Sequence, residues 1–197
     1  MAKLTMSMIP IVLVLLYITC KIESTSASAT TSFIRSKCSS TTYPSLCFQT
    51  LSSYASTIQT SQHQLVQTAL SVSVERAQAT QSFMKKLAKF KGLKAREYAA
   101  IKDCLEEMSD DVDRLSKSVK ELKGMGKDRH GADFMWHMSN IETWVSAALT
   151  DGTTCMDGFS GKTMNARIRS SIRTRVTNVA QVTSNALVLV NQYAGAN

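Results

Sequence analysis

The sequence predicts an all-α protein: an antiparallel up-down-up-down four-helix bundle with an N-terminal helical hairpin extension and two disulfides. Three observations lead to this fold class. Ala, Ser, Thr, Leu and Val dominate and only two prolines occur, a composition that favours helices. Apolar residues recur at helical spacing through four long segments. Apart from Cys20, close to the N-terminus, the chain carries four cysteines, an even number.

Residues 1–29 have the features of a secretory signal peptide. A basic start at Lys3 leads into the apolar run IVLVLLYI, and the polar stretch that follows ends ASA, so cleavage is expected near Ala29. Removing Lys3, Lys21 and Glu23 from 23 basic and 15 acidic side chains leaves 21 and 14, a net charge of +7. We therefore expect a basic, secreted, extracellular protein of one domain. No membrane span is expected, because neither this apolar run nor any later one reaches the length of about 18 residues that a span needs.

The segment 30–60 is predicted to be a helical hairpin followed by a linker. Two apolar pieces, SFIRSKC and PSLCFQTL, are joined by the turn-rich SSTTY, and Pro44 suits the first turn of the second helix. We interpret them as a hairpin stapled by Cys38 and Cys47, with SSYASTIQTSQHQ as a polar linker into a bundle domain, residues 61–197. Four cysteines permit three connectivities, so the pairing stays open at this point.

The first two long helices show different strengths of pattern. The first runs from about Ser61 to Phe90 with a broad apolar face, and Gly92 ends it. In the second, apolar residues follow an unbroken 3,4,3,4,3,4,3 spacing, which is typical of a helix packed in a bundle. This predicted seam consists of Tyr98, Ile101, Leu105, Met108, Val112, Leu115, Val119 and Leu122.

The third and fourth long helices follow the loops GMGKDRHG and SGKTMN. The third begins near Asp133, and its seam is Phe134, Met138, Ile141, Val145, Ala148, Gly152, Cys155 and Phe159. The seam of the fourth is Ile168, Ile172, Val176, Val179, Val182, Ala186, Val190 and Tyr193. Gly152 and Gly158 each weaken the third helix by up to about 1 kcal/mol against Ala, so an early end there is an alternative. Four helices joined by short loops give the up-down-up-down topology.

No residue pattern predicts a catalytic residue, a metal site or a cofactor. Cys155 lacks a base, because His137 lies about 27 Å away by helical rise and His130 lies in the glycine-containing loop. C-x-x-C, H-x-x-x-H and H-E-x-x-H spacings are missing from the sequence, and so is a strand before GMG that would make a phosphate-binding loop. The acids of EEMSDDVD, residues 106–113, are interpreted as a solvated helix face. In an oxidising compartment, an even number of cysteines favours disulfides over thiol chemistry.

Basic side chains gather in two clusters, one around the turn between the first two long helices and one at the start of the fourth. A solvated surface is the plain interpretation. The functional one is a weak attraction to an acidic polymer or an acidic partner protein, with nucleic acid excluded as a partner by the secretory route. The clusters consist of Lys85, Lys86, Lys89, Lys91, Lys94 and Arg96, and of Arg167, Arg169, Arg173 and Arg175.

Four blocks of the mature chain form a recognisable set. They are C-x8-C containing YPSLC, D-C-x-E at 103–106, W-x-S-A-A-L-T-D-x-x-T-C-x-D-x-F at 144–159 and TSNALVLVN at 183–191. Together they resemble the plant invertase and pectin methylesterase inhibitor family over essentially the whole mature chain. The resemblance implies a four-helix bundle with a hairpin, disulfides Cys38–Cys47 and Cys104–Cys155, and no catalytic activity.

The resemblance also implies a stoichiometric inhibitor in the plant cell wall, or apoplast. The methylesterase branch binds pectin methylesterase one to one and covers the cleft where pectin enters, whereas the invertase branch blocks a sucrose-hydrolysing enzyme. FSGKTMNARIRSS lacks the Pro-Lys-Phe usual in invertase inhibitors, so pectin methylesterase is the favoured target and cell-wall or vacuolar invertase the alternative. A free-standing inhibitor is expected rather than a pro-region, and its basic clusters suggest a weak association with acidic pectin.

Motif positions imply four partner-binding residues: Glu106, Asp110, Thr154 and Asp157. Each has a plain structural interpretation as well. The two acids on the second long helix are an i,i+4 pair that suits a solvated face, and the other two could be polar groups at a helix end. A disulfide between the second and third helices would bring both pairs into one polar patch.

Overall fold

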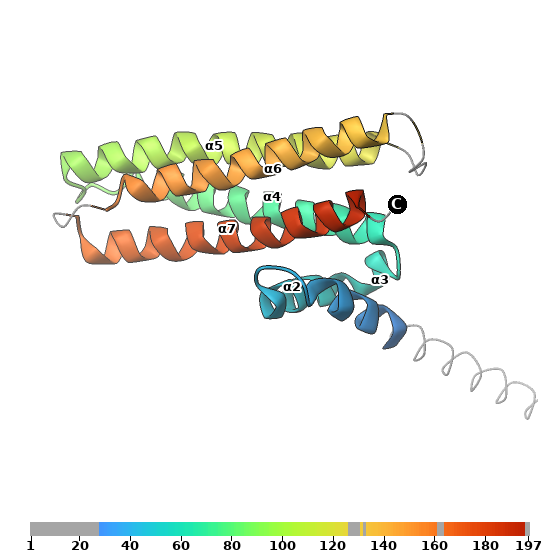
Figure 1. Ribbon diagram of the computed structural model, residues 1–197. Coiled ribbons are helices and arrows are strands. Elements are labelled where there is room, and N and C mark those ends of the chain that lie inside the picture. Colours follow the sequence, from blue (N-terminus) through green and yellow to red (C-terminus); the bar gives the residue numbers. More distant parts are fainter. Residues whose placement is uncertain (1–27, 126–130, 132, 161–163, 196–197) are drawn as a thin grey trace, which may run out of the picture.

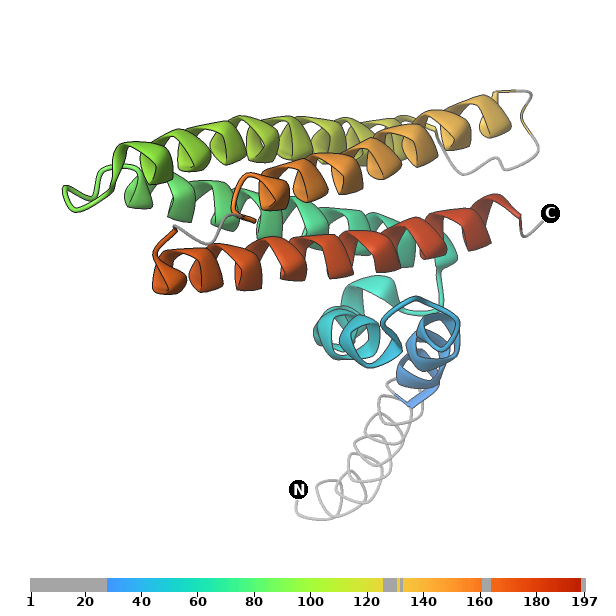
Figure 2. The same ribbon diagram turned by 60° about the vertical axis from the view of Figure 1, so that its left-hand side comes forward.

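A computed structural model describes residues 28–125, 131, 133–160 and 164–195. The signal peptide predicted over residues 1–29 lies outside this range except for its last two residues, as does most of the loop GMGKDRHG. The long helices lie side by side, with a small helical unit against one side of them (Figures 1 and 2). The long helices are α4 (Gln62–Leu87), α5 (Ala95–Gly124), α6 (Phe134–Asp157) and α7 (Ala166–Ala194).

The helices form the predicted antiparallel up-down-up-down bundle, which confirms the fold class. Helix α5 packs against α4 and α6, and α7 packs against the same two helices from the other side. The diagonal pairs are therefore α4 with α6 and α5 with α7. As a consequence, the face made by α5 and α6 lies opposite the face made by α4 and α7.

Polar caps fix where the long helices begin. The Ser61 hydroxyl accepts a hydrogen bond from the Gln64 amide at the start of α4. At the start of α5, the buried Glu97 carboxylate accepts from the amides of Lys94 at 3.0 Å and Asn165 at 2.7 Å. These two backbone hydrogen bonds hold the pKa of Glu97 below its usual value. Glu97 thereby ties the first turn of α5 to the residue that caps α7.

The seam predicted for α6 is buried throughout, from Phe134 to Phe159. The helix continues to Asp157 despite Gly152, and Gly158 is its C-cap. An early end of the helix was the alternative, and the structure excludes it. Cys155 therefore lies within the helix, on its buried side.

The seam predicted for α5 is wrong in half of its positions. Ile101, Met108, Leu115 and Leu122 are fully buried, but Tyr98 is 46% exposed and Leu105, Val112 and Val119 are only half-buried. The other half of the buried stripe is polar or carries sulfur, which is why apolar spacing does not reveal it. It consists of Glu97, Cys104, Asp111 and Ser118, each seven residues from the next. The rotation of α5 about its own axis that places Cys104 against α6 also buries the other three side chains of this face.

The hairpin is more helical than predicted. Helical residues 28–38 lead through a turn to α2 (Pro44–Leu51), which continues into the 3₁₀ helix η1 (Ser52–Tyr54) and α3 (Ala55–Ile58). The segment expected to be a polar linker is therefore largely helical, and its Ile58 is buried. The Cys38–Cys47 disulfide, with the two Cα atoms 5.5 Å apart, closes the hairpin. Ile34, Leu51 and Ile58 belong to the same core as the bundle side chains.

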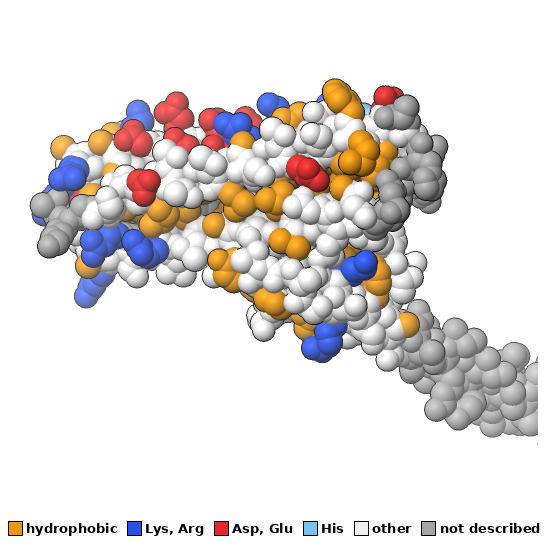
Figure 3. Space-filling model, viewed as in Figure 1, with side chains coloured by type: hydrophobic (Ala, Val, Ile, Leu, Met, Phe, Trp, Pro, Cys, Tyr) orange, Lys and Arg blue, Asp and Glu red, His pale blue; other side chains and the backbone are white. Residues whose placement is uncertain are grey.

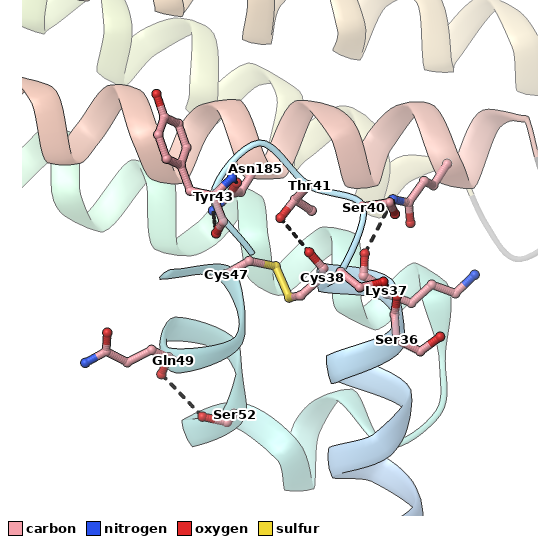
Figure 4. Close-up of a disulfide and its surroundings, with 12 residues drawn as sticks. Ser36, Lys37, Cys38, Ser40, Thr41, Tyr43, Cys47, Gln49, Ser52 and Asn185 are labelled. Carbon is pink, nitrogen blue, oxygen red and sulfur yellow. Dashed lines mark hydrogen bonds between the residues drawn. A yellow bond between two sulfur atoms is a disulfide. The ribbon is translucent and has the colours of Figure 1, made fainter. Parts of the chain in front are cut away.

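One buried side chain of α7 docks the hairpin onto the bundle (Figure 4). Asn185 Oδ1 accepts a hydrogen bond from the Tyr43 amide at 2.8 Å, and Asn185 Nδ2 donates to the Tyr43 carbonyl at 3.0 Å. The Ser184 hydroxyl donates to Thr42, and Gln192 donates to Ser40. Asn185 satisfies both backbone groups of Tyr43 where the hairpin turn meets α7, so the TSNALVLVN block has a structural reason for this asparagine.

Replacing Asn185 with Ala should release the hairpin from the bundle. Both Tyr43 backbone groups would lose their partner, at a cost of about 2 kcal/mol. We expect a lower free energy of urea unfolding and faster proteolysis within residues 28–60. Asn178→Ala, on the same helix but away from the hairpin, is the matched control. Equal proteolysis of the two variants would contradict this role.

Candidate functional site

The candidate site lies on the face where α5 and α6 are covalently joined. The Cys104–Cys155 disulfide links the two helices with their Cα atoms 4.3 Å apart, and both cysteines are buried. A bond at this point fixes the height of one helix against the other. We call the four implied partner-binding residues the α5/α6 patch: Glu106, Asp110, Thr154 and Asp157.

The antiparallel helices bring the four residues of the patch to similar heights. With a rise of about 1.5 Å per residue, Glu106 lies about 3 Å and Asp110 about 9 Å from the disulfide along the bundle axis. Thr154 lies about 1.5 Å away in the same direction, and Asp157 about 3 Å away in the opposite one. All four are exposed, and their heights along the bundle axis span about 12 Å.

Thr154 is held by its own helix. Its hydroxyl donates to the carbonyl of Thr150 at 3.1 Å, which satisfies the donor, and the residue is exposed. Thr153 makes the same bond to Leu149. Since α6 continues through both residues, the position of Thr154 is set by a regular helix and not by a loop.

Carboxylates surround the patch. Figure 3 shows Asp and Glu side chains gathered along the upper edge, over α5 and α6. Asp151 of α6 accepts a hydrogen bond from Arg114 Nε of α5 at 2.8 Å, an ion pair that crosses the helix boundary. Beneath it, Asp111 is 1% exposed, and neither of its carboxylate oxygens has a hydrogen-bond partner among the described residues.

Burial and crowding raise the pKa values of three of these acids. Burial raises the pKa of Asp111 from 3.8 to about 7, and the charge of Asp151 adds to the effect. Burial also raises the pKa of Asp151, against the opposing charge of Arg114. The pKa of Glu107 rises through burial and then through the charges of Asp151, Asp110 and Glu106. These three carboxyl groups and the Arg114 guanidinium thus lie close enough to shift one another's charge equilibria at the boundary between α5 and α6.

The sequence reasoning missed Arg114, Asp151 and Asp111. Asp151 lies inside the SAALTD block, where it had no assigned role, and in the structure it pairs with Arg114 across the helix boundary. A signal for Asp111 was present, because it follows Cys104 by one heptad. If Cys104 faces α6, then Asp111 must face it too.

The surroundings of the cysteines and histidines exclude thiol catalysis at Cys155. A cysteine in a disulfide has no thiolate to act as a nucleophile. His137 instead contacts Glu121, with Nδ1 2.7 Å from the carboxylate oxygen, and this bond holds the pKa of Glu121 below its usual value. Within the residues that the structure describes, no group of three or more His, Cys, Asp and Glu side chains could hold a metal ion. None of the described helices is long and apolar enough to cross a membrane.

The fold and the candidate site are those of a disulfide-stapled helical bundle with an exposed polar face on α5 and α6. Residues 32–189 match the family model described as plant invertase/pectin methylesterase inhibitor. The chain belongs to this family, as the four sequence blocks predicted. Membership of an inhibitor family also confirms the prediction that the chain is not an enzyme.

Relatives with known names support the same assignment. The chain is 56% identical to the "21 kDa protein" of Daucus carota, over 88% of this chain and 89% of that one. It is 55% identical to Pectinesterase inhibitor 9 of Arabidopsis thaliana, over 82% and 80% of the two chains. A crystal structure of a mutant form of a pectin methylesterase inhibitor from Arabidopsis superposes with a TM-score of 0.63. It covers 78% of this chain and 92% of that one at 21% identity, which is a likeness of fold.

Proposed function

We propose that this protein is a secreted inhibitor of plant pectin methylesterase that acts in the cell wall. It binds the enzyme one to one and covers the cleft where pectin enters. The observation that carries the proposal is family membership together with 55% identity to a relative named as a pectinesterase inhibitor. Four cysteines in two disulfides suit an extracellular, oxidising compartment.

The α5/α6 patch is the surface that we propose for contact with the enzyme. Its four side chains are exposed, lie at similar heights and come from two helices that a disulfide holds together. A rigid surface loses little conformational entropy on docking, so more of the contact energy appears as affinity. The acidic surroundings would steer the inhibitor toward a basic region beside the cleft of the enzyme. Inhibition is then steric, and the inhibitor supplies no catalytic group.

Titration of a plant pectin methylesterase with the purified protein tests the proposal. Release of methyl ester from pectin should fall linearly and reach its minimum at one equivalent of inhibitor. Cell-wall invertase, titrated in parallel, is the alternative target because the same fold serves both branches of the family. Full methylesterase activity at excess inhibitor across acidic to neutral pH would rule the proposal out.

Charge reversal in the patch should weaken inhibition without unfolding the protein. Asp110→Lys places a cation where the enzyme is expected to meet an acid, and we expect an inhibition constant at least about tenfold higher. Glu75→Lys makes the same charge change on the exposed side of α4, away from the patch, and is the matched control. If both variants inhibit equally well, α5 and α6 do not form the contact surface.

The basic charge of the protein supports a second, weaker interaction. We propose that the mature chain, with its net charge of +7 after loss of residues 1–29, is attracted to the carboxylates of de-esterified pectin. The attraction would keep the inhibitor in the wall where its target acts. Because exposed charges are screened, it should weaken strongly between about 0.05 and 0.5 M salt.

A further inference from the structure

A groove runs between α4 and α7, on the face opposite the α5/α6 patch. Three arginines line it: Arg76 from α4, and Arg173 and Arg175 from α7. The rest of its lining is almost entirely side chains that carry hydroxyl or amide groups. These are Ser170, Ser171, Thr174, Thr177, Asn178 and Gln181.

Among the residues that the structure describes, no acidic side chain forms an ion pair with the arginines of this groove. The ion pairs found among the described residues are Arg114 with Asp151 and His137 with Glu121, and both lie on the other side of the bundle. Arg76 and Arg173 are exposed. Arg175 lies over the Phe83 ring, with its guanidinium carbon 4.2 Å from the ring centroid, a cation–π contact that leaves its charge in place. Figure 3 shows basic side chains gathered over the beginning of α7.

We infer that the α4/α7 groove is a binding site for a linear acidic polysaccharide that carries carboxylates on successive sugar rings. Planar guanidinium groups bind carboxylates through two parallel hydrogen bonds. The hydroxyl and amide side chains between the arginines match the donors and acceptors of sugar hydroxyls. From Ser170 to Gln181 the groove extends about 16 Å along α7, long enough for several linked sugar units.

The lining favours a polysaccharide over an acidic segment of a protein. Protein interfaces draw most of their affinity from buried aromatic or aliphatic anchors. Phe83 is the aromatic residue in this groove, and the Arg175 guanidinium covers it. The other side chains that line the groove carry a charge, a hydroxyl or an amide group, which suits a hydrated chain of sugars.

The position of the groove has a consequence for inhibition, which rests on the proposed function. An enzyme bound at the α5/α6 patch would leave the opposite face of the bundle open. The inhibitor could then hold a de-esterified stretch of pectin and the enzyme at the same time. Loss of the groove should therefore reduce wall retention and leave the stoichiometry of inhibition unchanged.

The test compares two double variants that each remove two positive charges. Arg76→Gln with Arg173→Gln alters the groove, whereas Lys85→Gln with Lys89→Gln alters exposed positions outside it. The probe is a de-esterified oligogalacturonide, with its fully methyl-esterified form as the uncharged counterpart. Affinity is measured by calorimetry on the full mature protein, and folding is checked by circular dichroism.

We expect the arginine variant to bind the charged probe about tenfold more weakly or worse, and the lysine variant to stay within about twofold of the unchanged protein. The esterified probe should bind weakly to all three. Equal losses of affinity in both variants would show that net charge alone attracts the probe and would overturn the inference. The absence of binding by the unchanged protein would overturn it as well. A poly-glutamate peptide that binds the groove as tightly would overturn the choice of a saccharide. Methylesterase titrations with both variants separate this result from the proposed function, which fails only if the unchanged protein does not inhibit.

Discussion

Asp111→Asn is expected to stabilise the protein near neutral pH and to remove most of the decline in its stability with rising pH. Asp111 is buried on α5, and in the part of the chain that the structure describes both of its carboxylate oxygens lack a hydrogen-bond partner. Arg114 and Asp151, the charged groups that act on it, are engaged with each other. An ionised carboxylate at this position is therefore poorly compensated, and the folded protein holds the proton instead.

The direction of the pH effect follows from the raised pKa. Between the ordinary value of 3.8 and about 7, the unfolded chain loses the proton of Asp111 while the folded protein keeps it. The folded state then binds more protons, so the free energy of unfolding falls as pH rises through this window. The full difference amounts to about 4 kcal/mol, and it is complete above about pH 7. Asn keeps the shape of the protonated acid and has no proton to lose.

Urea unfolding at about pH 4.5 and about pH 7.5 measures this effect. The two proteins should have similar stability at the lower pH, and the Asn variant should be the more stable at the higher one. Asp113→Asn, at an exposed position on the same helix, is the matched control. If the stability of Asp111→Asn and that of the unchanged protein depended on pH in the same way, Asp111 would be ionised in the folded protein.

Removing the Cys104–Cys155 disulfide is expected to have the second large effect. The bond closes a sequence separation of 51 residues, and the chain-entropy model assigns such a link about 4 kcal/mol. We expect a Cys104→Ser, Cys155→Ser variant to lose about this much free energy of unfolding. Since the bond also fixes α5 against α6, the inhibition constant should rise even at temperatures where the variant remains folded.

The hairpin disulfide provides a matched comparison. Cys38–Cys47 closes a separation of only 9 residues, for which the same model gives about 2.5 kcal/mol. A Cys38→Ser, Cys47→Ser variant should therefore lose less stability, and its inhibition constant should change little, because the α5/α6 patch is untouched. If removal of the hairpin disulfide impaired inhibition more, the hairpin would carry the contact surface.

Sequence patterns were most informative where the buried residues are apolar. The seam of α6 was predicted correctly, and so was that of α7 apart from the half-buried Ile168, since burial of Val, Ile, Ala and Met produces a strong helical period. In α5 the buried stripe alternates apolar residues with Glu97, Cys104, Asp111 and Ser118, so half of it carries no apolar signal. The predicted seam therefore followed half-buried residues along one edge of the stripe, such as Val112 and Val119.

Some residues of the candidate site were indicated by the sequence, and others were found only in the structure. Motif positions indicated Glu106, Asp110, Thr154 and Asp157 from the sequence, and they remain a proposal. The Arg114–Asp151 ion pair and the arginine-lined groove join residues from different helices. The spacing of residues along one helix does not reveal such pairs, because it shows only which residues share a face of that helix and not which residues of another helix they meet.

The sequence by itself determined that the chain is helical, how many long helices it has and which side of most of them is apolar. These properties follow from local spacing, since residues three and four apart share a helix face. Only the tertiary structure decided how α5 is turned against α6, and that Asn185 holds Tyr43 across a sequence separation of 142. Such contacts depend on which helices meet and at what height, and those are set by packing and crosslinks among distant parts of the chain.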